Sequence, residues 1–475
     1  MSERIRTDVC VIGAGSGGLS VAAAAVQMGA RVVLIEKGRM GGDCLNYGCV
    51  PSKSLIAAAR AAEAIRSSGR YGVGGGDPQI DFARVHEHVH GVIAGIAPHD
   101  SVERIESLGV RVLRAAGCFT GRGELQAGDV SVRARRFVIA TGSSPAVPPI
   151  PGLADGPYLT NETIFDLRQA PEHLIVIGGG PIGAELAQAH HRLGVQVTQI
   201  ARGRLLPKDD PELVEVIRSR FAADGVALFE ETATRQIEGD GSGCRVIAER
   251  AGETVSIAGS HLLVAAGRTA NVAGLGLDLA GVAYSERGIT VDKRLRTSNK
   301  RIFAIGDVTG RHQFTHVAGY HAGIVIRNAL FLLPAKVDDS AVPWVTYTEP
   351  ELAHVGLTEA AARERFGAAV RALRWPFAEN DRARTERDTE GLVKVALGRG
   401  GRILGASIVG AGVGDQLAIW CLAVSRKMKI GAVAGLLLPY PTRSEVGKRV
   451  AGEHYTAKLF SERTRALVRL LQRLP

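Results

Sequence analysis

The chain has 475 residues, of which 45% are hydrophobic and 22% are charged, and its formal net charge at pH 7 is +10. This length exceeds what one hydrophobic core usually holds, so we expect several domains of ordinary globular composition. Lys and Arg are dispersed, without a basic stripe interleaved with aromatic residues, so the charge predicts a solvated surface and no nucleic-acid partner.

The cysteine content and the hydropathy pattern argue against two further classes of protein. Six cysteines are too few for a disulfide scaffold in a chain of this length. No apolar run approaches the roughly 20 residues that cross a bilayer. The charged N-terminus leads directly into a predicted strand rather than into the apolar core of a signal peptide. We therefore expect a cytoplasmic protein without an integral membrane segment.

Residues 8–36 follow the pattern strand, glycine-rich loop, helix, strand. Gly13 is placed for the tight turn after the first strand, Gly15 for close approach of the backbone to a pyrophosphate, and Gly18 for close packing of helix on strand. Glu36 ends the second strand, 18 residues after Gly18, where a carboxylate accepts a ribose hydroxyl. Because the glycine loop lies between a predicted strand and a predicted helix, and a second strand ending in a carboxylate follows, it predicts a dinucleotide site.

Residues 41–53 contain Cys44 and Cys49, just before a predicted helix start at Pro51. Disulfides need Cα atoms within about 7 Å, so two residues five apart cannot bridge within a regular helix, and residues 46–48 are expected to bend the chain. Cys49 then lies near a helix N-terminus, which favours the thiolate. A redox disulfide fits this pattern, and so does a static disulfide or a pair of buried thiols. Zinc is not predicted, because no second Cys or His pair follows at ligand spacing.

Residues 173–201 repeat the first pattern at one offset of 165 residues. The three loop glycines of the first unit correspond here to Gly178, Gly180 and Gly183. A predicted helix and a second strand follow, as in the first unit. The repeat therefore predicts a second dinucleotide site.

The end of the second unit indicates which nucleotide it binds. Ala201 replaces the ribose-binding carboxylate, and Arg202, Arg204 and Lys208 follow it. Loss of the carboxylate removes repulsion of a 2′-phosphate, and the basic residues attract it. We expect NADPH, with NADH as the alternative if Arg202 is only a solvated loop charge.

Together these motifs resemble the class I pyridine nucleotide–disulfide oxidoreductases, which include dihydrolipoyl dehydrogenase, glutathione reductase and mercuric reductase. The resemblance covers nearly the whole chain, and the cysteine segment is its most specific part. Its marks are the glycine loops at 13–18 and 178–183, the cysteine segment at 44–53, and residues 140–142, 266–268 and 303–307.

The resemblance implies FAD in the first nucleotide site and NADPH or NADH in the second. Asp307 matches a residue that contacts the ribityl and phosphate region of the flavin. Lys53 and Glu185 match a pair near flavin N5, and an ordinary surface ion pair is the alternative. The cofactor motifs also include Thr141, Gly142 and Gly267.

The resemblance also implies an electron relay. The nucleotide gives hydride to the flavin, and the reduced flavin passes two electrons to the disulfide. Cys49 matches the flavin-side sulfur, which holds a charge-transfer thiolate, and Cys44 matches the outer sulfur that meets the acceptor.

The implied fold class is α/β, with two Rossmann-like nucleotide-binding domains and a C-terminal α+β dimerisation domain. We expect the FAD domain at 1–146 and 277–340, the NAD(P) domain at 147–276, and the dimerisation domain at 341–475. The expected homodimer completes each active site with residues of the partner subunit.

The chain departs from the dithiol-handling members of this family at Tyr440, where those members carry a histidine base paired with a glutamate at the position of Glu445. Tyrosine titrates at about pH 10 and histidine at about 6.5, so Tyr440 is a poor base at neutral pH. Efficient turnover of dihydrolipoyl or glutathione substrates is therefore not expected. Mercuric reductase has tyrosine at this position, but residues 470–475 lack its cysteine pair.

Three further features leave alternatives open. Asp43 stands where many family members have threonine, and it would disfavour the Cys44 thiolate, tune the site toward cations, or cap a helix toward solvent. His86 and His90 share a helix face that can ligate metal, although a solvated face is favoured. Residues 460–474 predict a basic amphipathic helix that packs within the dimer or contacts a membrane peripherally.

The leading hypothesis is a homodimeric FAD enzyme that passes electrons from NADPH through Cys49 and Cys44 to a small-molecule or metal-ion acceptor, with a mercuric-reductase-like core. Soft thiolates suit a metal such as Hg(II), and the other acceptor class is a disulfide that needs no histidine base. The alternatives are dihydrolipoyl dehydrogenase proper and a redox-sensing or interaction protein without turnover on the same scaffold.

Overall fold

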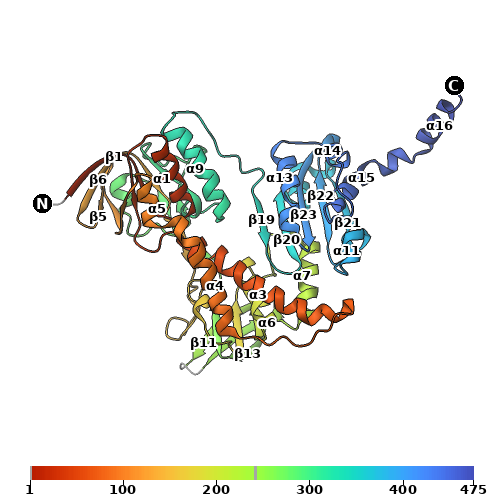
Figure 1. Ribbon diagram of the computed structural model, residues 1–475, viewed down its shortest axis with the longest axis horizontal. Coiled ribbons are helices and arrows are strands. Elements are labelled where there is room, and N and C mark those ends of the chain that lie inside the picture. Colours follow the sequence, from red (N-terminus) through yellow and green to blue (C-terminus); the bar gives the residue numbers. More distant parts are fainter. Residues whose placement is uncertain (1–2, 240–242, 475) are drawn as a thin grey trace. The chain divides into compact units, whose positions relative to one another are not determined.

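The computed structural model of the protein describes residues 3–239 and 243–474. The chain divides into two compact units (Figure 1). The first unit consists of Met1–Arg202 and Phe229–Val337, and the second of Gly203–Leu228 and Asp338–Pro475.

A seven-stranded sheet forms one half of the first unit. Its strand order is β3-β2-β1-β6-β5-β4, with β18 beside β6. Strands β1, β2, β3, β6 and β18 pair in parallel, whereas β4 and β5 form an antiparallel extension of β6. These strands are β1 (Glu3–Ile12), β2 (Val32–Ile35), β3 (Arg111–Leu113), β4 (Gly117–Gly121), β5 (Glu124–Ala127), β6 (Val130–Ile139) and β18 (Ile302–Ala304).

The central strand β1 is buried on both faces. Val9 and Val11 belong to the core under α1 (Ser16–Gln27) and α9 (Thr315–Ala329), whereas Cys10 and Ile12 belong to the core on the opposite face. The side chains alternate along the strand, and a parallel sheet covered on both faces requires both sets to be apolar. Helices α1 and α9 pack side by side (Figure 1).

A second parallel sheet lies in the other half of the first unit. Its strand order is β10-β9-β8-β14, and α6 (Pro181–Arg192) connects β8 to β9. Three antiparallel strands, β11, β12 and β13, lie between β10 and β14 in the chain. The strands of this half are β8 (His173–Ile177), β9 (Gln196–Ile200), β10 (Ala227–Phe229), β11 (Thr232–Gly239), β12 (Cys244–Arg250), β13 (Glu253–Gly259) and β14 (His261–Val264).

Short elements complete the first unit. The two-stranded pairs are β7 (Ser143–Pro145) with β15 (Arg268–Ala270), and β16 (Tyr284–Ser285) with β17 (Gly288–Ile289). The remaining helices are α2 (Gly42–Asn46), α3 (Cys49–Ser67), α4 (Phe82–Ile96), α5 (Val102–Ser107) and α8 (Leu277–Ala280), with a 3-10 turn, η4, at Gly306–Thr309.

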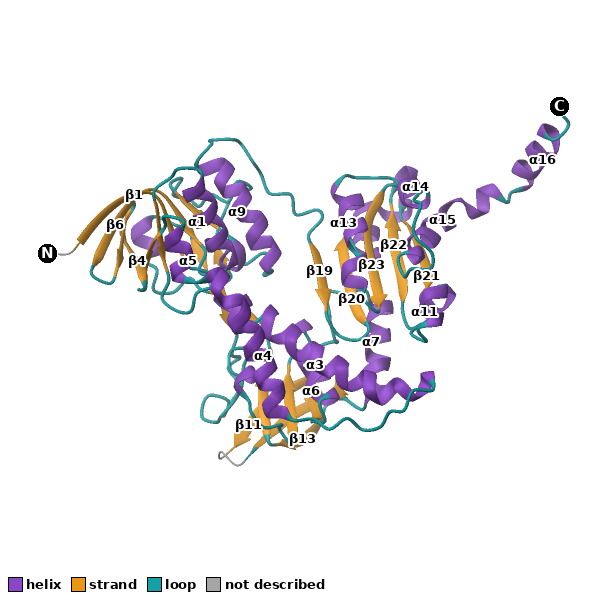
Figure 2. Ribbon diagram, viewed as in Figure 1, coloured by secondary structure: helices purple, strands orange, loops and turns teal. Residues whose placement is uncertain are grey.

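The second unit contains a five-stranded antiparallel sheet of order β19-β20-β23-β22-β21, drawn in orange among purple helices in Figure 2. Trp420 and Phe377 are fully buried in its core. The strands are β19 (Pro343–Thr346), β20 (Glu351–Gly356), β21 (Arg371–Pro376), β22 (Leu392–Leu397) and β23 (Ile403–Gly410). The helices are α7 (Pro211–Asp224), α10 (Glu359–Phe366), α11 (Asp381–Thr385), α12 (Val413–Gln416), α13 (Ala418–Ser425), α14 (Ile430–Ala434), α15 (Glu445–Leu459) and α16 (Glu462–Leu471).

A buried ion cluster explains why the segment that carries α7 groups with this sheet. The ammonium of Lys394 lies 2.8 Å from Asp210, 2.9 Å from Glu212 and 2.8 Å from Glu359. Burial by itself favours the neutral amine, but the hydrogen bonds that Lys394 donates to the three carboxylates outweigh it and raise the pKa of Lys394. Removing one partner would leave uncompensated buried charge, so the cluster ties the start of α7 to β22.

Candidate redox-active site

The first glycine loop has the geometry of a pyrophosphate cradle. A Cβ at Gly13 would clash with the carbonyl of Ala140, and one at Gly18 would clash with the carbonyl of Gly13, so both positions need glycine for close packing. Gly15 caps α1 without any side-chain hydrogen bond, and a Cβ there would touch only the Cα of Gly42, at 3.9 Å. The free N–H groups at the start of α1 therefore face a space that suits an anionic dinucleotide.

The other residues predicted to hold FAD follow the carboxyl ends of neighbouring parallel strands. Glu36 follows β2, and its carboxylate accepts hydrogen bonds from the backbone N–H groups of Ala14 and Gly38, both at 2.6 Å. Asp307 follows β18 and accepts a hydrogen bond from Ser143 Oγ at 2.6 Å. Burial raises the pKa of Asp307. Ligands bind at this edge in open α/β sheets, so the predicted residues fit FAD here.

The loop after β6 and the turn before β15 lie at the same edge. Thr141 Oγ1 donates a hydrogen bond to the carbonyl of Asn271 at 2.8 Å, and the Gly142 carbonyl accepts one from the Asn271 N–H at 3.0 Å. The Gly267 carbonyl accepts a hydrogen bond from Ala146 N–H at 2.9 Å. These three positions are thus held by backbone pairing between the two loops.

The second glycine loop repeats the first. A Cβ at Gly178 would clash with the Ala265 carbonyl, one at Gly183 would clash with the Gly178 carbonyl, and Gly180 faces open space. Gly180 caps α6, again without a side-chain hydrogen bond. The geometry therefore suits a second dinucleotide.

The basic residues after β9 are exposed. Ala201 is buried and pairs with Phe229 and Thr232 through its backbone. Arg202 is the last residue of the first of the two chain segments that form the first unit, whereas Arg204 and Lys208 belong to the second unit. All three side chains are exposed to solvent.

The two cysteines of the predicted disulfide lie on consecutive helices. Cys44 is in the short helix α2, and Cys49 is the first residue of α3. Asn46 holds the bend, since its Nδ2 donates to the carbonyls of Met40 and Gly42 at 2.9 and 2.8 Å. The pair is a dithiol in this structure, and Cys49 Sγ lies 3.3 Å from Thr315 Oγ1 at the start of α9.

The two thiols differ in acidity. The Cys44 thiol donates a hydrogen bond to Cys49, and this bond, together with Thr315 and the charge of Lys53, lowers the pKa of Cys49 to about 6. The same hydrogen bond, together with burial, raises the pKa of Cys44. At neutral pH the pair therefore holds one proton, on the outer sulfur, and one thiolate, on the inner sulfur.

In the reduced protein, alkylation by iodoacetamide should identify this thiolate. We expect Cys49 to react at a nearly constant rate above pH 7 and to slow as the pH falls through about 6, because protonation removes the nucleophile. Replacing Cys44 by alanine should shift this midpoint upward, since the largest cause of the low pKa is lost. Mass spectrometry of the alkylated peptides measures both. Cys421, whose pKa burial raises, is the internal control that should react only at higher pH.

Lys53 and Glu185 form the predicted pair. Lys53 Nζ lies 2.7 Å from Glu185 Oε2, and the side chain of Glu185 is 6% exposed while that of Lys53 is 36% exposed. The pair joins α3 to α6 and is therefore more than a surface contact, because one partner is buried. Whether it acts beside a flavin stays a prediction.

Asp43 faces protein rather than solvent. Its carboxylate accepts a hydrogen bond from Asn161 Nδ2 at 3.2 Å and lies 3.1 Å from Arg268 Nη2. Arg268 also donates to the Oγ of Ser143 at 2.7 Å. The charge of Asp43, next to the outer cysteine, is thus neutralised by a guanidinium from a distant loop.

Tyr440 and Glu445 lie near the start of α15 in the second unit. The Tyr440 hydroxyl is exposed and donates to Asp381 Oδ2 at 3.1 Å, which raises the pKa of Tyr440. Glu445 instead accepts a long hydrogen bond of 3.4 Å from the N–H of Thr442. The two side chains are not paired, and Tyr440 remains a neutral phenol at physiological pH.

Sequence reasoning missed Thr315, Asn161 and Ser143, and it named Arg268 only as part of a motif. One feature of the sequence could have pointed to Thr315: it begins the helix that follows Asp307, the residue predicted to bind the flavin. The rings of His86 and His90 lie against each other in a tilted arrangement, with centroids 4.1 Å apart. Among the residues that the structure describes, no group of three or more Cys, His, Asp or Glu side chains could hold a metal ion.

Comparisons with known proteins show the family. The family model described as pyridine nucleotide-disulphide oxidoreductase matches residues 7–322, and the dimerisation domain of that family matches residues 342–451. The chain is 36% identical to a mercuric reductase of Streptomyces lividans over 94% of this chain and 95% of that protein. It is 34% identical to a dihydrolipoyl dehydrogenase of Geobacillus stearothermophilus over 94% and 96% of the two chains.

Two solved structures have the same overall fold as this chain. The Cu(II) complex of the HOCl-induced flavoprotein disulfide reductase RclA from Escherichia coli superposes with a TM-score of 0.84 at 28% identity, covering 93% of this chain and 99% of that one. LpdA from Mycobacterium tuberculosis superposes with a TM-score of 0.85 at 28% identity, covering 94% and 99%. The predicted fold class is confirmed.

Within 3–239 and 243–474, no helix combines the length and apolar character needed to cross a bilayer.

Two glycine loops, a cysteine pair between them and a C-terminal dimerisation domain occur in one chain that the family models match almost throughout. The protein therefore belongs to the pyridine nucleotide-disulphide oxidoreductase family and is an FAD-dependent oxidoreductase.

Proposed function

We propose that the protein passes electrons from NADPH, by way of FAD, to the Cys44–Cys49 pair and on to a metal-ion or disulfide acceptor, in the manner of mercuric reductase. The observation that carries this proposal is the unequal acidity of the two thiols. An inner thiolate with a pKa of about 6 beside a protonated outer thiol is the state that a two-electron-reduced redox pair needs.

The residues that would hold FAD fit it. The glycine cap at Gly15, the N–H groups at the start of α1, and the carboxylates of Glu36 and Asp307 lie along one sheet edge. When bound, FAD supplies hydride acceptance from the nucleotide and two-electron transfer to a disulfide. The chain's own part is to keep Cys49 ionised, through Thr315 and Lys53, and to keep the proton on Cys44.

Tyr440 favours a metal ion over a dithiol substrate. In the homodimer that the dimerisation domain supports, Tyr440 of the partner subunit faces Cys44 in this proposal. Because its pKa is raised, this phenol does not take a proton from a substrate thiol at neutral pH. A soft metal ion binds thiolates directly, so its reduction does not depend on such a base. A mercuric reductase is among the relatives, and RclA is described as a Cu(II) complex.

The second nucleotide site favours NADPH in this proposal. Ala201 is buried where the first site has Glu36, so no carboxylate repels a 2′-phosphate. Arg202 follows Ala201 with an exposed side chain, and its guanidinium would bind that phosphate.

An acceptor assay tests the proposal. The purified FAD-loaded protein is given NADPH or NADH without oxygen, together with either Hg(II) in excess thiol or lipoamide. We expect oxidation of NADPH in preference to NADH, and only with Hg(II). Faster turnover with lipoamide would make dihydrolipoyl dehydrogenase the better assignment. Rapid flavin reduction without turnover of either acceptor would refute the metal reductase and favour a redox-sensing role.

A further inference from the structure

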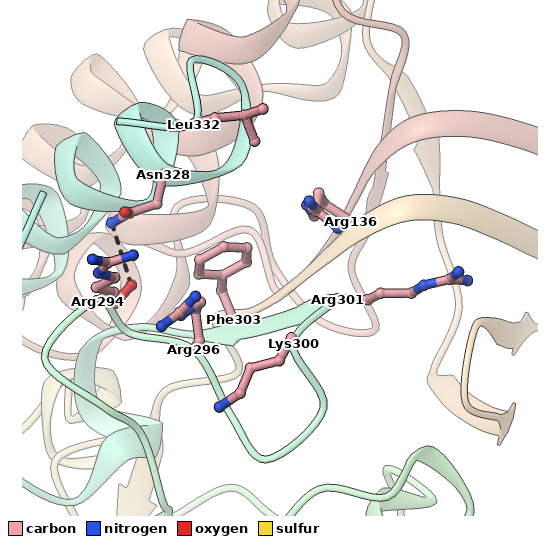
Figure 3. A pocket seen from close by; sticks show the side chains of 8 residues that line it. All are labelled: Arg136, Arg294, Arg296, Lys300, Arg301, Phe303, Asn328 and Leu332. Carbon is pink, nitrogen blue, oxygen red and sulfur yellow. Dashed lines mark hydrogen bonds between the residues drawn. The ribbon is translucent and has the colours of Figure 1, made fainter. Parts of the chain in front are cut away.

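A cluster of basic residues surrounds a cavity of about 250 Å³ in the first unit (Figure 3). Its walls come from β6, from the chain around β18, and from the end of α9. The lining residues are Arg136, Arg294, Arg296, Lys300, Arg301, Phe303, Asn328 and Leu332. Five of these eight residues are cations, and none of them is acidic.

This basic pocket lies at the opposite sheet edge from the FAD site. Lys300 and Arg301 precede β18, whereas Asp307 follows it. Arg136 lies within β6, and the N–H of the next residue, Phe137, donates to the Arg301 carbonyl at 3.0 Å, so the pocket lies where β18 begins to pair with β6. In an open α/β sheet the cofactor binds at the carboxyl ends of the strands. The pocket, at the amino end of β18, is therefore separate from the predicted FAD site.

The positive charge of the pocket is mostly uncompensated. Arg296 pairs with Asp292 at 2.9 Å. Lys300 Nζ donates a hydrogen bond to the Thr297 carbonyl at 3.4 Å. Within the described part of the chain, neither Lys300 nor Arg294 forms an ion pair with a carboxylate. Closely spaced cations without counter-charges repel one another, and an anion relieves that repulsion.

Arg136, in the wall of the basic pocket, also has a polar group that no acceptor satisfies among the described residues. Its Nε is buried without a hydrogen-bond partner among the described residues. Burial lowers the pKa of Arg136, and the charges of Arg135 and Arg301 lower it further. A buried guanidinium N–H without an acceptor is costly, so the wall of the pocket holds a positive charge that is poorly compensated.

The backbone around the pocket is held in place. The N–H groups of Arg294 and Arg296 both donate to Asp292 Oδ1, at 2.8 and 3.0 Å. Asn328 Nδ2 donates to the Arg294 carbonyl at 3.4 Å, a bond drawn dashed in Figure 3. In this view the two arginines lie beside the Phe303 ring, whereas the Arg301 side chain points away. Hydrogen bonds thus fix the backbone turn that carries Arg294 and Arg296.

We propose that this basic pocket binds a phosphorylated anion with at least two negative charges, such as a diphosphate group, at a site separate from both dinucleotide loops. Guanidinium groups match phosphate oxygens in charge and in bidentate geometry. The volume suits a phosphorylated head rather than a whole dinucleotide. The rim carries the exposed turn of Phe331, Leu332 and Leu333, so the phosphate can belong to a free metabolite or to a lipid headgroup.

Calorimetric titration of the FAD-loaded protein with pyrophosphate tests the free source. We expect saturable binding that weakens by at least about tenfold in Arg294→Gln/Lys300→Gln, because each lost charged hydrogen bond costs about 1.5–3 kcal/mol. Arg84→Gln/Arg245→Gln removes two exposed cations elsewhere in the first unit and should bind like the wild type. Any binding at the nucleotide loop persists in the pocket variant, so only the difference between the two variants measures the pocket.

Cosedimentation with phosphatidylcholine vesicles, with and without phosphatidylinositol 4-phosphate, tests the lipid source. Binding that needs the phosphorylated lipid and is lost only in the pocket variant supports the site with a headgroup as ligand. FAD content, thermal unfolding and reduction by NADPH should be equal in all variants. No saturable binding of either probe, or equal loss in the pocket and control variants, overturns the proposal.

Discussion

Replacement of Cys44 by serine is expected to lower acceptor-dependent turnover by at least about 1,000-fold while FAD content and fold are retained. Serine cannot form the disulfide, so electrons no longer reach an outer thiol. The inner Cys49 remains beside Thr315 in this variant. NADPH should therefore still bleach the flavin in a stopped-flow absorbance experiment without oxygen, although steady-state turnover is lost.

Two further variants make this result specific. Cys49→Ser should lose turnover equally, and it should also lose the long-wavelength absorbance that the inner thiolate gives next to an oxidised flavin. Cys118→Ser changes a half-buried thiol of the same unit and should leave both readouts unchanged. Turnover of Cys44→Ser near the wild-type rate would show that the acceptor takes electrons without the cysteine pair.

Tyr440→His is expected to raise the rate of lipoamide reduction by about 100-fold, the usual contribution of a positioned acid–base group. Imidazole titrates at about pH 6.5, whereas hydrogen bonding to Asp381 raises the pKa of the Tyr440 phenol above its ordinary value of about 10. The histidine would also stand near Glu445, which accepts only one long hydrogen bond from Thr442. The rate of lipoamide reduction by Tyr440→His should therefore have a bell-shaped dependence on pH.

A matched substitution separates acid–base chemistry from packing. Tyr440→Phe removes the hydroxyl but no base, so lipoamide reduction should stay as slow as in the wild type, and its pH profile should not change. The side chain is exposed, so neither substitution should alter thermal unfolding. An equal rise in both variants, or none in Tyr440→His, would show that Tyr440 does not limit the choice of acceptor.

The cofactor loops were accessible from the sequence because their geometry is local. Gly13, Gly15 and Gly18 act within one strand–turn–helix unit, and the offset repeat at Gly178 follows the same rule. The cysteine segment was accessible for the same reason, since α2, the bend and the start of α3 are contiguous. Ion pairs between distant helices, such as Lys53 with Glu185, needed the family resemblance.

The sequence by itself determined two dinucleotide loops, a candidate redox pair between them and a C-terminal region of a different class, because short-range glycine, cysteine and apolar patterns specify these features. Only the tertiary structure decided that Thr315 lies beside Cys49 across 266 residues of sequence, and that Arg268 neutralises Asp43. It also assembled the basic pocket from three separate segments. Such contacts depend on how strands pair and helices cross, which no local pattern encodes.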